Sequence, residues 1–336
     1  MIRQLGRRLL LALLVVYGVT LATFALARVL PGNPAYLIVG PNADPAAVRA
    51  AEDSLGLNQS LPAQYATYMK DLFTGHLGVS LTSGQPVIRD IADRFPATLE
   101  LALLSLALAI VMAFAIGIPA ALRPRGMLAR IADVVSAGGA AMPQFWLGLV
   151  LLFFFFYRLG AFPGPLSQYP GPVEPHHITG VLFVDTLLEL NFHAWVLVLW
   201  GLALPVITLA VTAQPPLLRI VQTQMRRALS SDPVRTARAI GVSPTRVVLN
   251  DALRLTLGPV LNMVALVFGA LLSSSVLVET VFSWPGIGQY AVQAINSSDY
   301  AAIQGVVLIS AVTYVVLFLL VDLALFAVDP RLRSRS

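Results

Sequence analysis

The sequence predicts an all-α integral membrane protein, and its composition and hydropathy pattern support this class. Hydrophobic residues make up 57% of the 336 residues, and charged residues make up only 12%. A soluble domain carries roughly 25% charged residues, so this chain lacks the polar side chains needed to cover a water-facing exterior. Its apolar residues lie in long continuous runs without the two-residue alternation of strands, which favours helices in lipid.

Six runs are long enough to cross a bilayer, whose hydrocarbon core needs roughly 20 apolar residues per helix. The first run follows a basic N-terminus and could pass for a signal peptide, with Ala25-Leu26-Ala27 as its cleavage site. We interpret it as a spanning helix that also directs insertion, because it is long enough to span. Pro205 interrupts the fourth run and Gln214-Pro215-Pro216 ends it. The predicted spans are 9–30, 97–122, 132–157, 195–213, 256–281 and 303–328.

The distribution of basic residues predicts the orientation. Sixteen of the 22 basic residues lie on one side: three near the N-terminus, three in 123–131, seven in 214–255 and three in the C-terminal tail. The positive-inside rule makes this side cytoplasmic and places both termini there, so the net charge of +5 needs no nucleic-acid partner. We divide the chain into 1–30 (N-terminus and first span), an extracytoplasmic region 31–96 and a five-span core 97–336, which includes the cytoplasmic loop 214–255.

The loop 214–255 contains two helix start signals. Asp232 is a predicted N-cap, and Pro233 fits the first helical position because proline loses nothing there by lacking an N–H. Gly241 suits the left-handed turn that ends a helix, and Ser243-Pro244 repeats the start signal. The pattern predicts two short helices, the second of which merges into the following span.

This loop can be interpreted in three ways. A basic loop can simply hold the topology of the neighbouring spans. A DNA-reading helix-turn-helix is disfavoured, because the helices are short, tethered at both ends to spans and poor in Asn and Gln. A docking element for a soluble partner accounts for the paired start signals. Ala237 and Gly241 would share a small-residue face of its first helix, flanked by Arg235 and Arg238.

Motifs along nearly the whole chain match one family. They are RVLPGNPA (28–35), LGLNQSLPAQYATYM with GHLGVSL (within 55–81), RFPATLELAL (94–103), RTARAIGVSPTRVVLNDALR (235–254), ETVFSWPGIGQYAVQAI (279–295) with Asp299, and DPRLR (329–333). In this order they resemble the permease subunits of bacterial ABC importers of the dipeptide, oligopeptide and nickel class, with 235–254 as the cytoplasmic EAA-type loop. The long outer loop 158–194 resembles that of dipeptide-type permeases more than the shorter loop of nickel or glutathione types.

Some positions depart from the pattern of that family. Asn33 stands where Asp is usual, Pro233 replaces an aromatic residue, and Ile240 replaces a lysine. Asp251 and Leu255 replace a usual His and Asn in the second helix of the loop. These last two departures concern the detail of the partner contacts rather than the family.

The resemblance implies a type I ABC importer permease fold, with six transmembrane helices and both termini in the cytoplasm of a bacterium. It implies a second homologous permease, ABC nucleotide-binding subunits, an extracytoplasmic substrate-binding protein and inner-membrane lipid as partners. The helix 233–241 would sit in a groove of one nucleotide-binding subunit. The expected coupling contacts are Asp232, Arg235, Ala237, Arg238, Gly241, Val242 and Ser243.

The chain carries no phosphate-binding loop of its own. The pattern G-x-x-x-x-G-K-[ST] is absent, and the only lysine, Lys70, lies in the outer region 31–96. The PGIG sequence at 285–288 lacks the strands and helix that surround a dinucleotide loop. We therefore expect a transport subunit that is not an enzyme and binds no cofactor, with ATP and Mg²⁺ bound by partner subunits.

A path for peptides should offer hydrogen bonds without tight specificity, because a peptide carries amides and two charged termini. Small polar residues in membrane helices also serve helix packing, and Glu279 and Asp322 lie near span ends, where anchoring is an equal alternative. The cluster His176, His177 and His193 lacks the acidic or cysteine spacing of a metal site, so no metal is expected. The candidates for the path are Gln144, Ser273, Ser274, Ser275 and Glu279.

We expect 31–96 to form two short helices, about 46–55 and 62–74, within a scoop that receives the binding protein. The predicted function is ATP-driven import of di- and oligopeptides, with this chain forming half of the path. The same machinery importing glutathione, a nickel complex or haem is an alternative. An ion-coupled secondary transporter would need intramembrane acids in repeated halves, and an intramembrane enzyme would need a catalytic constellation inside the spans; neither pattern is present.

Overall fold

The computed structural model describes residues 2–29, 35, 39–40, 43–54, 56–165, 168–171, 175–176 and 178–328. The secondary structure of these residues is helical, apart from one isolated antiparallel bridge between Val79 and Pro86. Four helical stretches are long and apolar enough to cross a membrane, in agreement with the predicted all-α class. They contain α5 (Val87–Leu122), α9 (Phe192–Leu229), α12 (Leu253–Phe282) and α14 (Tyr300–Val328).

A fifth candidate span is bent, and the first helix adds a further apolar stretch. The bent pair joins α6 (Met127–Ala141) to α7 (Gln144–Leu151) with the π-helix η1 (Leu152–Arg158). The first helix, α1 (Ile2–Val29), covers almost all of the first predicted span, and its stretch Leu10–Ala25 is apolar. By length and composition, the described residues contain four helical stretches that could each cross a membrane, or five if the bent pair is counted as one span.

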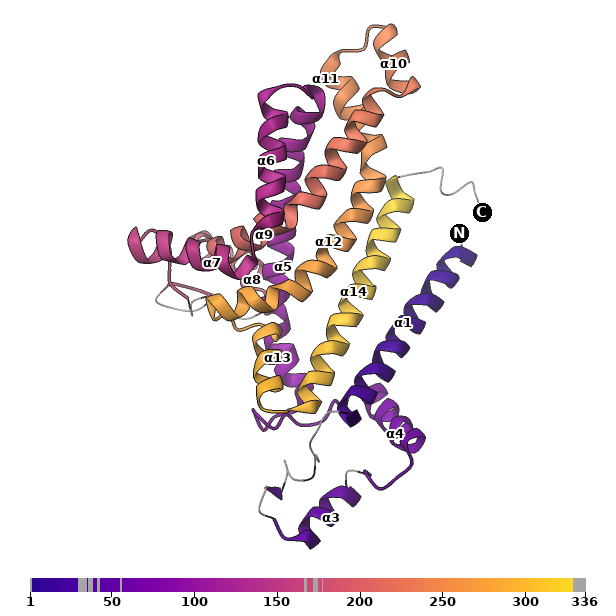
Figure 1. The fold of residues 1–336 in the computed structure, drawn as a ribbon, viewed down its shortest axis with the longest axis vertical. Helices are drawn as coiled ribbons and strands as arrows, with labels where there is room; N and C mark the ends of the chain where they lie inside the picture. Colours follow the sequence, from indigo (N-terminus) through magenta and orange to yellow (C-terminus); the bar gives the residue numbers. More distant parts are fainter. Residues whose placement is uncertain are drawn as a thin grey trace.

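The centre of the molecule is built from α5, α9 and α12 (Figure 1). Alanine lines the buried face of α5, with Ala102, Ala109, Ala113 and Ala120 each 0% exposed. Small side chains let helix backbones approach closely, which is how helices associate in lipid, where apolar burial alone gives no preference for another helix. Larger side chains of α9 and α12, including Leu209, Leu218, Phe268 and Leu271, complete the same buried cluster.

The predicted span at 132–157 is divided between two helices. α6 and the α7–η1 segment meet at 103°, and α7 extends sideways from the bundle (Figure 1). Met142 has an extended backbone (φ −83°, ψ 123°), as favoured before a proline, and Pro143 cannot donate the hydrogen bond that would continue α6.

The expected end of the fourth span at 214–216 is wrong, because α9 continues through Pro205, Pro215 and Pro216 to Leu229. Pro215 cannot donate to the carbonyl of Val211, four residues earlier. That carbonyl faces Gly139 of α6 so closely that a Cβ added there would lie 2.5 Å from it. Packing against α5, α6 and α12 thus outweighs the local proline signal.

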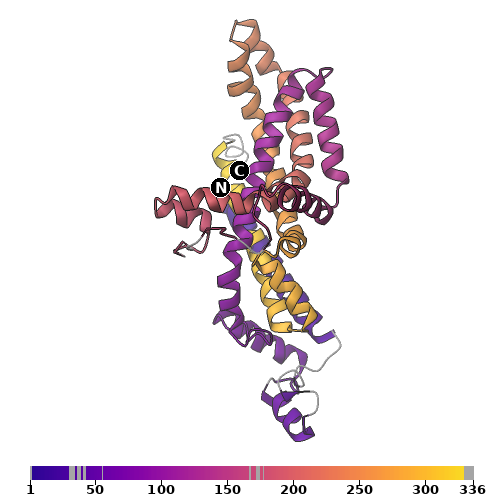
Figure 2. The same ribbon diagram turned by 90° about the vertical axis from the view of Figure 1, so that its left-hand side faces the viewer.

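The predicted short outer helices are confirmed as α3 (Pro45–Ser54) and α4 (Leu61–Phe73). They lie at one end of the molecule, opposite the loop after α9, in both views (Figures 1 and 2). Aromatic contacts fix α4 to α1: the Tyr65 and Phe24 ring centroids are 5.3 Å apart, and 3.0 Å separates the hydroxyls of Tyr65 and Thr20. The helix α13 (Ile287–Asn296) lies toward the same end.

Candidate functional site

The loop after α9 folds into α10 (Asp232–Ala239), which lies at the far tip of the molecule (Figure 1). The predicted N-cap at Asp232 is wrong by one residue, because Ser231 is the cap. The Ser231 hydroxyl donates to the carbonyl of Ala228 at 2.6 Å and so makes no cap bond. Asp232 lies in the first turn, 3.7 Å from Arg235, and this exposed pair contributes little to stability.

The predicted left-handed turn at Gly241 is confirmed, with φ of 83°. The Gly241 N–H donates to the carbonyl of Arg238, and the Val242 N–H donates to that of Ala237, both at 3.1 Å. This pair of bonds is a Schellman motif, which satisfies the last carbonyls of α10. No atom lies within 4 Å of a Cβ added at Gly241, so a larger residue there would strain the backbone rather than collide with this chain.

The inner face of α10 packs on this chain itself. Val234 is 0% exposed and belongs to a buried cluster, against which Ala237 and Val242 pack as half-buried side chains. The predicted shared small-residue face is therefore divided: Ala237 packs toward the chain while Gly241 is exposed. The other members of the cluster are Ala121 of α5, Met225 and Ala228 of α9, and Val247 and Ala252 of the π-helix η2 (Val247–Ala252), which leads into α12.

The outer face of α10 combines charge with an apolar tip. Arg235, Arg238 and Ser243 are exposed, and the Ile240 side chain is 75% exposed. Sequence analysis noted Ile240 only as a departure from the family, and its exposed position at the tip depends on the fold. The predicted second helix is confirmed: it starts with α11 (Pro244–Arg246) and continues through η2 into α12.

Glu279 and Ser275, two of the predicted path residues, are buried inside the chain. Glu279 is 0% exposed and accepts hydrogen bonds from the Thr98 hydroxyl at 2.8 Å and the Ser275 hydroxyl at 3.1 Å. It also accepts from the Gln289 N–H at 3.1 Å. A Cβ added at Gly288 would lie 2.7 Å from its Oε2. Glu279 thus holds the turn between α12 and α13 against α5.

The remaining path candidates lie on other surfaces. Ser273 is exposed and Ser274 half-buried, and their hydroxyls donate to carbonyls of their own helix at 3.3 Å. These bonds use the O–H donor of each hydroxyl and leave its acceptor lone pairs for a ligand. Gln144, the first residue of α7, has a buried Oε1 without a hydrogen-bond partner among the described residues.

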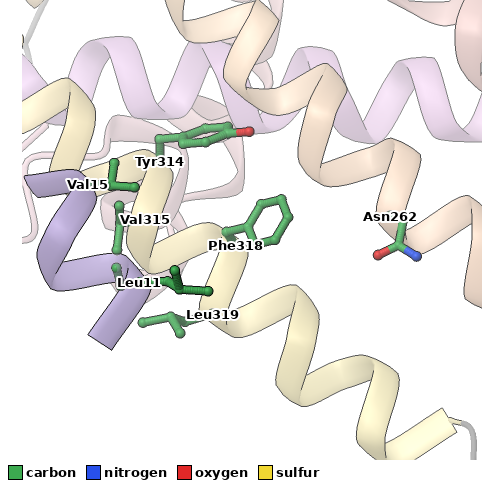
Figure 3. A pocket seen from close by; sticks show the side chains of 8 residues that line it. Leu11, Val15, Asn262, Tyr314, Val315, Phe318 and Leu319 are labelled. Carbon is green, nitrogen blue, oxygen red and sulfur yellow. The ribbon is translucent and has the colours of Figure 1, made fainter. Parts of the chain in front are cut away.

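An apolar groove between α1, α12 and α14 contains a polar residue that sequence analysis missed. Figure 3 shows Asn262 of α12 across a cavity of about 510 Å³ from Tyr314 and Phe318 of α14. Ser273 lines an adjoining cavity of about 550 Å³, which shares Tyr314. Asn262 is exposed on a helix long and apolar enough to span the membrane, where a polar side chain is costly unless it has a hydrogen-bonding partner.

No group of three metal-ligating side chains occurs among the described residues. His176 lies 3.2 Å from Glu189, while His177 falls outside the described residues. The described residues also leave out Asn33, the side chain of Asp322 and the motif 329–333.

Apolar helices of this length, with a basic helical loop beyond one end, define a multi-pass membrane protein. Residues 113–334 match the family described as binding-protein-dependent transport system inner membrane component. Residues 1–102 match its membrane-component N-terminal family. The chain belongs to this family of bacterial inner-membrane transport components.

Curated relatives cover nearly the whole chain. A probable D,D-dipeptide transport system permease, DdpB of Escherichia coli, is 38% identical over 95% of this chain and 94% of its own length. The dipeptide permease DppB of Alkalihalophilus pseudofirmus is 38% identical over 97% of this chain and 98% of its own. A glutathione permease, GsiC of E. coli, is 32% identical over all of both chains.

Proposed function

We propose that this chain is a permease subunit of an ABC importer of di- and oligopeptides and forms half of the translocation path. The full-length similarity to dipeptide permeases at 38% identity carries this proposal. Glutathione is itself a short peptide, so the 32% identity to a glutathione permease makes glutathione the second candidate substrate.

The proposed topology has six spans with both termini in the cytoplasm, as in a type I importer permease. It counts α1 as the first span and the bent pair α6 and α7–η1 as the third. The first residues of α1 and the last of α14 point toward the end that carries α10 (Figure 1), which supports an even number of crossings. The excess of arginine on that side supports a cytoplasmic location.

The proposed coupling site is the outer face of α10. Asp232, Arg235, Arg238, Gly241 and Ser243 are exposed and available to a nucleotide-binding subunit, which would bind ATP and Mg²⁺. Ala237 and Val242 serve the same site by holding α10 on its buried cluster. Because that cluster joins the ends of α5 and α9 to η2, a displacement of α10 would move these helices together.

The proposed path uses Gln144 and the exposed face of α12, including Ser273, together with a second homologous permease. Ser274 is half-buried beside it. An extracytoplasmic binding protein would deliver the peptide to the end that carries α3 and α4. Membrane lipid covers the remaining apolar surface.

The test is transport by the purified complex in proteoliposomes. We expect uptake of a labelled dipeptide to require ATP, the binding protein and a nucleotide-binding subunit that co-purifies with this chain. Uptake without ATP would refute the ABC mechanism. ATP-driven uptake of glutathione but of no dipeptide would instead favour the second candidate.

A further inference from the structure

A polar pocket of about 420 Å³ lies at the outer end of the molecule. The end of α3, one side of α4 and the turn at 74–78 form most of its wall, and Ala301 and Gln304 of α14 close it. Figure 1 shows α3 and α4 at this end, on the opposite side of the molecule from α10. None of the residues assigned above to coupling or to the path lines it.

Gln64 of α4 contributes a buried acceptor to this pocket. The side chain is only 9% exposed, and its Nε2 donates to the carbonyls of Leu57 at 3.0 Å and Gln59 at 2.8 Å. Only the NH₂ group of the amide can donate to carbonyls, so these two bonds fix its orientation. The opposite atom, Oε1, is buried and has no hydrogen-bond partner in the described part of the chain. A buried acceptor without a donor costs about 1–3 kcal/mol.

The charge around this acceptor is negative. Asp53 and Asp71 line the pocket, and within the described residues neither forms an ion pair. Asp53 accepts one hydrogen bond, from the Asn58 amide at 2.5 Å. Residues 31–80 hold four acidic and two basic residues, a net charge of −2 in a chain of net charge +5. Neither of these two basic residues, Arg49 and Lys70, lines the pocket, whereas His76 does, with its Nδ1 2.9 Å from the Thr74 hydroxyl.

We propose that this pocket binds a basic side chain, an arginine or a lysine, of the extracytoplasmic binding protein. Guanidinium and ammonium groups carry several N–H donors and no acceptor, which matches an amide oxygen beside two carboxylates. The position favours a docking protein over a peptide in transit, because the pocket lies on the outer helices, away from the core of α5, α9 and α12. This inference depends on the proposed function, which supplies the binding protein.

The test measures the ATPase rate of the whole complex in nanodiscs as a function of binding-protein concentration and salt. Asp71→Asn removes a pocket charge without disturbing a side-chain hydrogen bond among the described residues. Gln64→Met removes the acceptor at similar volume, together with the two hydrogen bonds of its Nε2, so Asp71→Asn is the decisive variant. Asp93→Asn, an exposed carboxylate on α5 outside the pocket, is the matched control. We expect both pocket variants to raise the half-saturating concentration about tenfold, as for a lost hydrogen bond to a charged group. Only Asp71→Asn, which removes a charge, should also weaken the salt dependence of that concentration.

Added arginine amide supplies a second measurement. It should compete with the binding protein in the wild type more strongly than sodium chloride of equal ionic strength does, and this excess should vanish in Asp71→Asn. If Asp71→Asn and Asp93→Asn had the same half-saturating concentration while the binding protein stimulated the wild type, the pocket would be excluded as the docking site and the proposed function would stand. If peptide uptake fell while the half-saturating concentration of binding protein stayed the same, the basic group in the pocket would belong to the transported peptide. The binding protein would then be excluded as the ligand of the pocket. A wild type that no binding protein stimulates would overturn the proposed function, and this partner with it.

Discussion

Replacing Glu279 by alanine should destabilise the outer half of the protein. The carboxylate is completely buried and joins three elements, because its donors come from α5, α12 and the start of α13. Alanine would leave the donors without their acceptor and open space behind the turn. Thr98 also accepts a hydrogen bond from the Ile287 N–H at 2.9 Å, so a shifted hydroxyl would loosen that turn further.

The magnitude follows from the number of donors left unpaired. The Ser275 hydroxyl can fall back on the carbonyl of Leu272, which it already approaches at 3.0 Å. The Thr98 hydroxyl and the Gln289 N–H have no such alternative among their described contacts. At about 1–3 kcal/mol for each buried unpaired group, the loss is about 2–6 kcal/mol. Glu279→Gln should cost less, because its carbonyl keeps one acceptor.

Thermal unfolding of the detergent-purified chain, followed by tryptophan fluorescence, measures this loss. Ser273→Ala is the matched control, because that hydroxyl is exposed on the same helix and bonded only within it. We expect the melting temperature to fall in the order wild type and Ser273→Ala, Glu279→Gln, Glu279→Ala. A Glu279→Ala protein with wild-type stability but lost peptide transport would refute this reasoning and return Glu279 to the path.

Three further predictions concern the loop, the bent span and the outer helices. Gly241→Val places a branched side chain at φ 83°, so we expect membrane insertion to persist while co-purification of the nucleotide-binding subunit is lost. Gly139→Leu drives a side chain into the carbonyl of Val211, and we expect a melting temperature lower by several degrees. Tyr65→Phe removes the hydroxyl contact with Thr20 and should cost about 0.5–1.5 kcal/mol, measurable as faster proteolysis of the α3–α4 segment.

Matched variants and contrary results separate these predictions from general damage. Gly138→Leu is the control for Gly139, because no atom lies within 4 Å of a Cβ added at Gly138. Equal melting of the two variants would contradict the close helix contact. Wild-type transport in Gly241→Val would refute the coupling assignment. Unchanged proteolysis in Tyr65→Phe would show that the aromatic contacts hold α4 without the hydroxyl.

Local signals predicted the elements whose determinants are close in sequence. The outer helices α3 and α4, the left-handed turn at Gly241 and the helix start at Ser243-Pro244 depend on residues within a few positions of each other, and all are confirmed. The family resemblance followed from motifs and is confirmed by the family matches.

The errors arose where distant residues decide the outcome. Prolines at 215 and 216 predict a helix end, but the helix continues because α5, α6 and α12 pack around it. The buried role of Glu279 depends on Thr98, which lies 181 residues earlier. Ala237 and Gly241 are correctly spaced for one face, yet only the packing around Val234 shows that Ala237 turns toward the chain while Gly241 stays exposed.

The unbroken course of α9 determines how far a small rotation can reach. Its 38 residues give about 57 Å of continuous helix from Phe192 to Leu229 beside α10, with three prolines inside it. A small tilt at its α10 end therefore passes along a continuous backbone that α5, α6 and α12 hold on its sides. A chain broken at 214–216 would have a joint there that absorbs such a tilt. In this protein, the same helix that meets the base of α10 would carry such a tilt onward to Phe192.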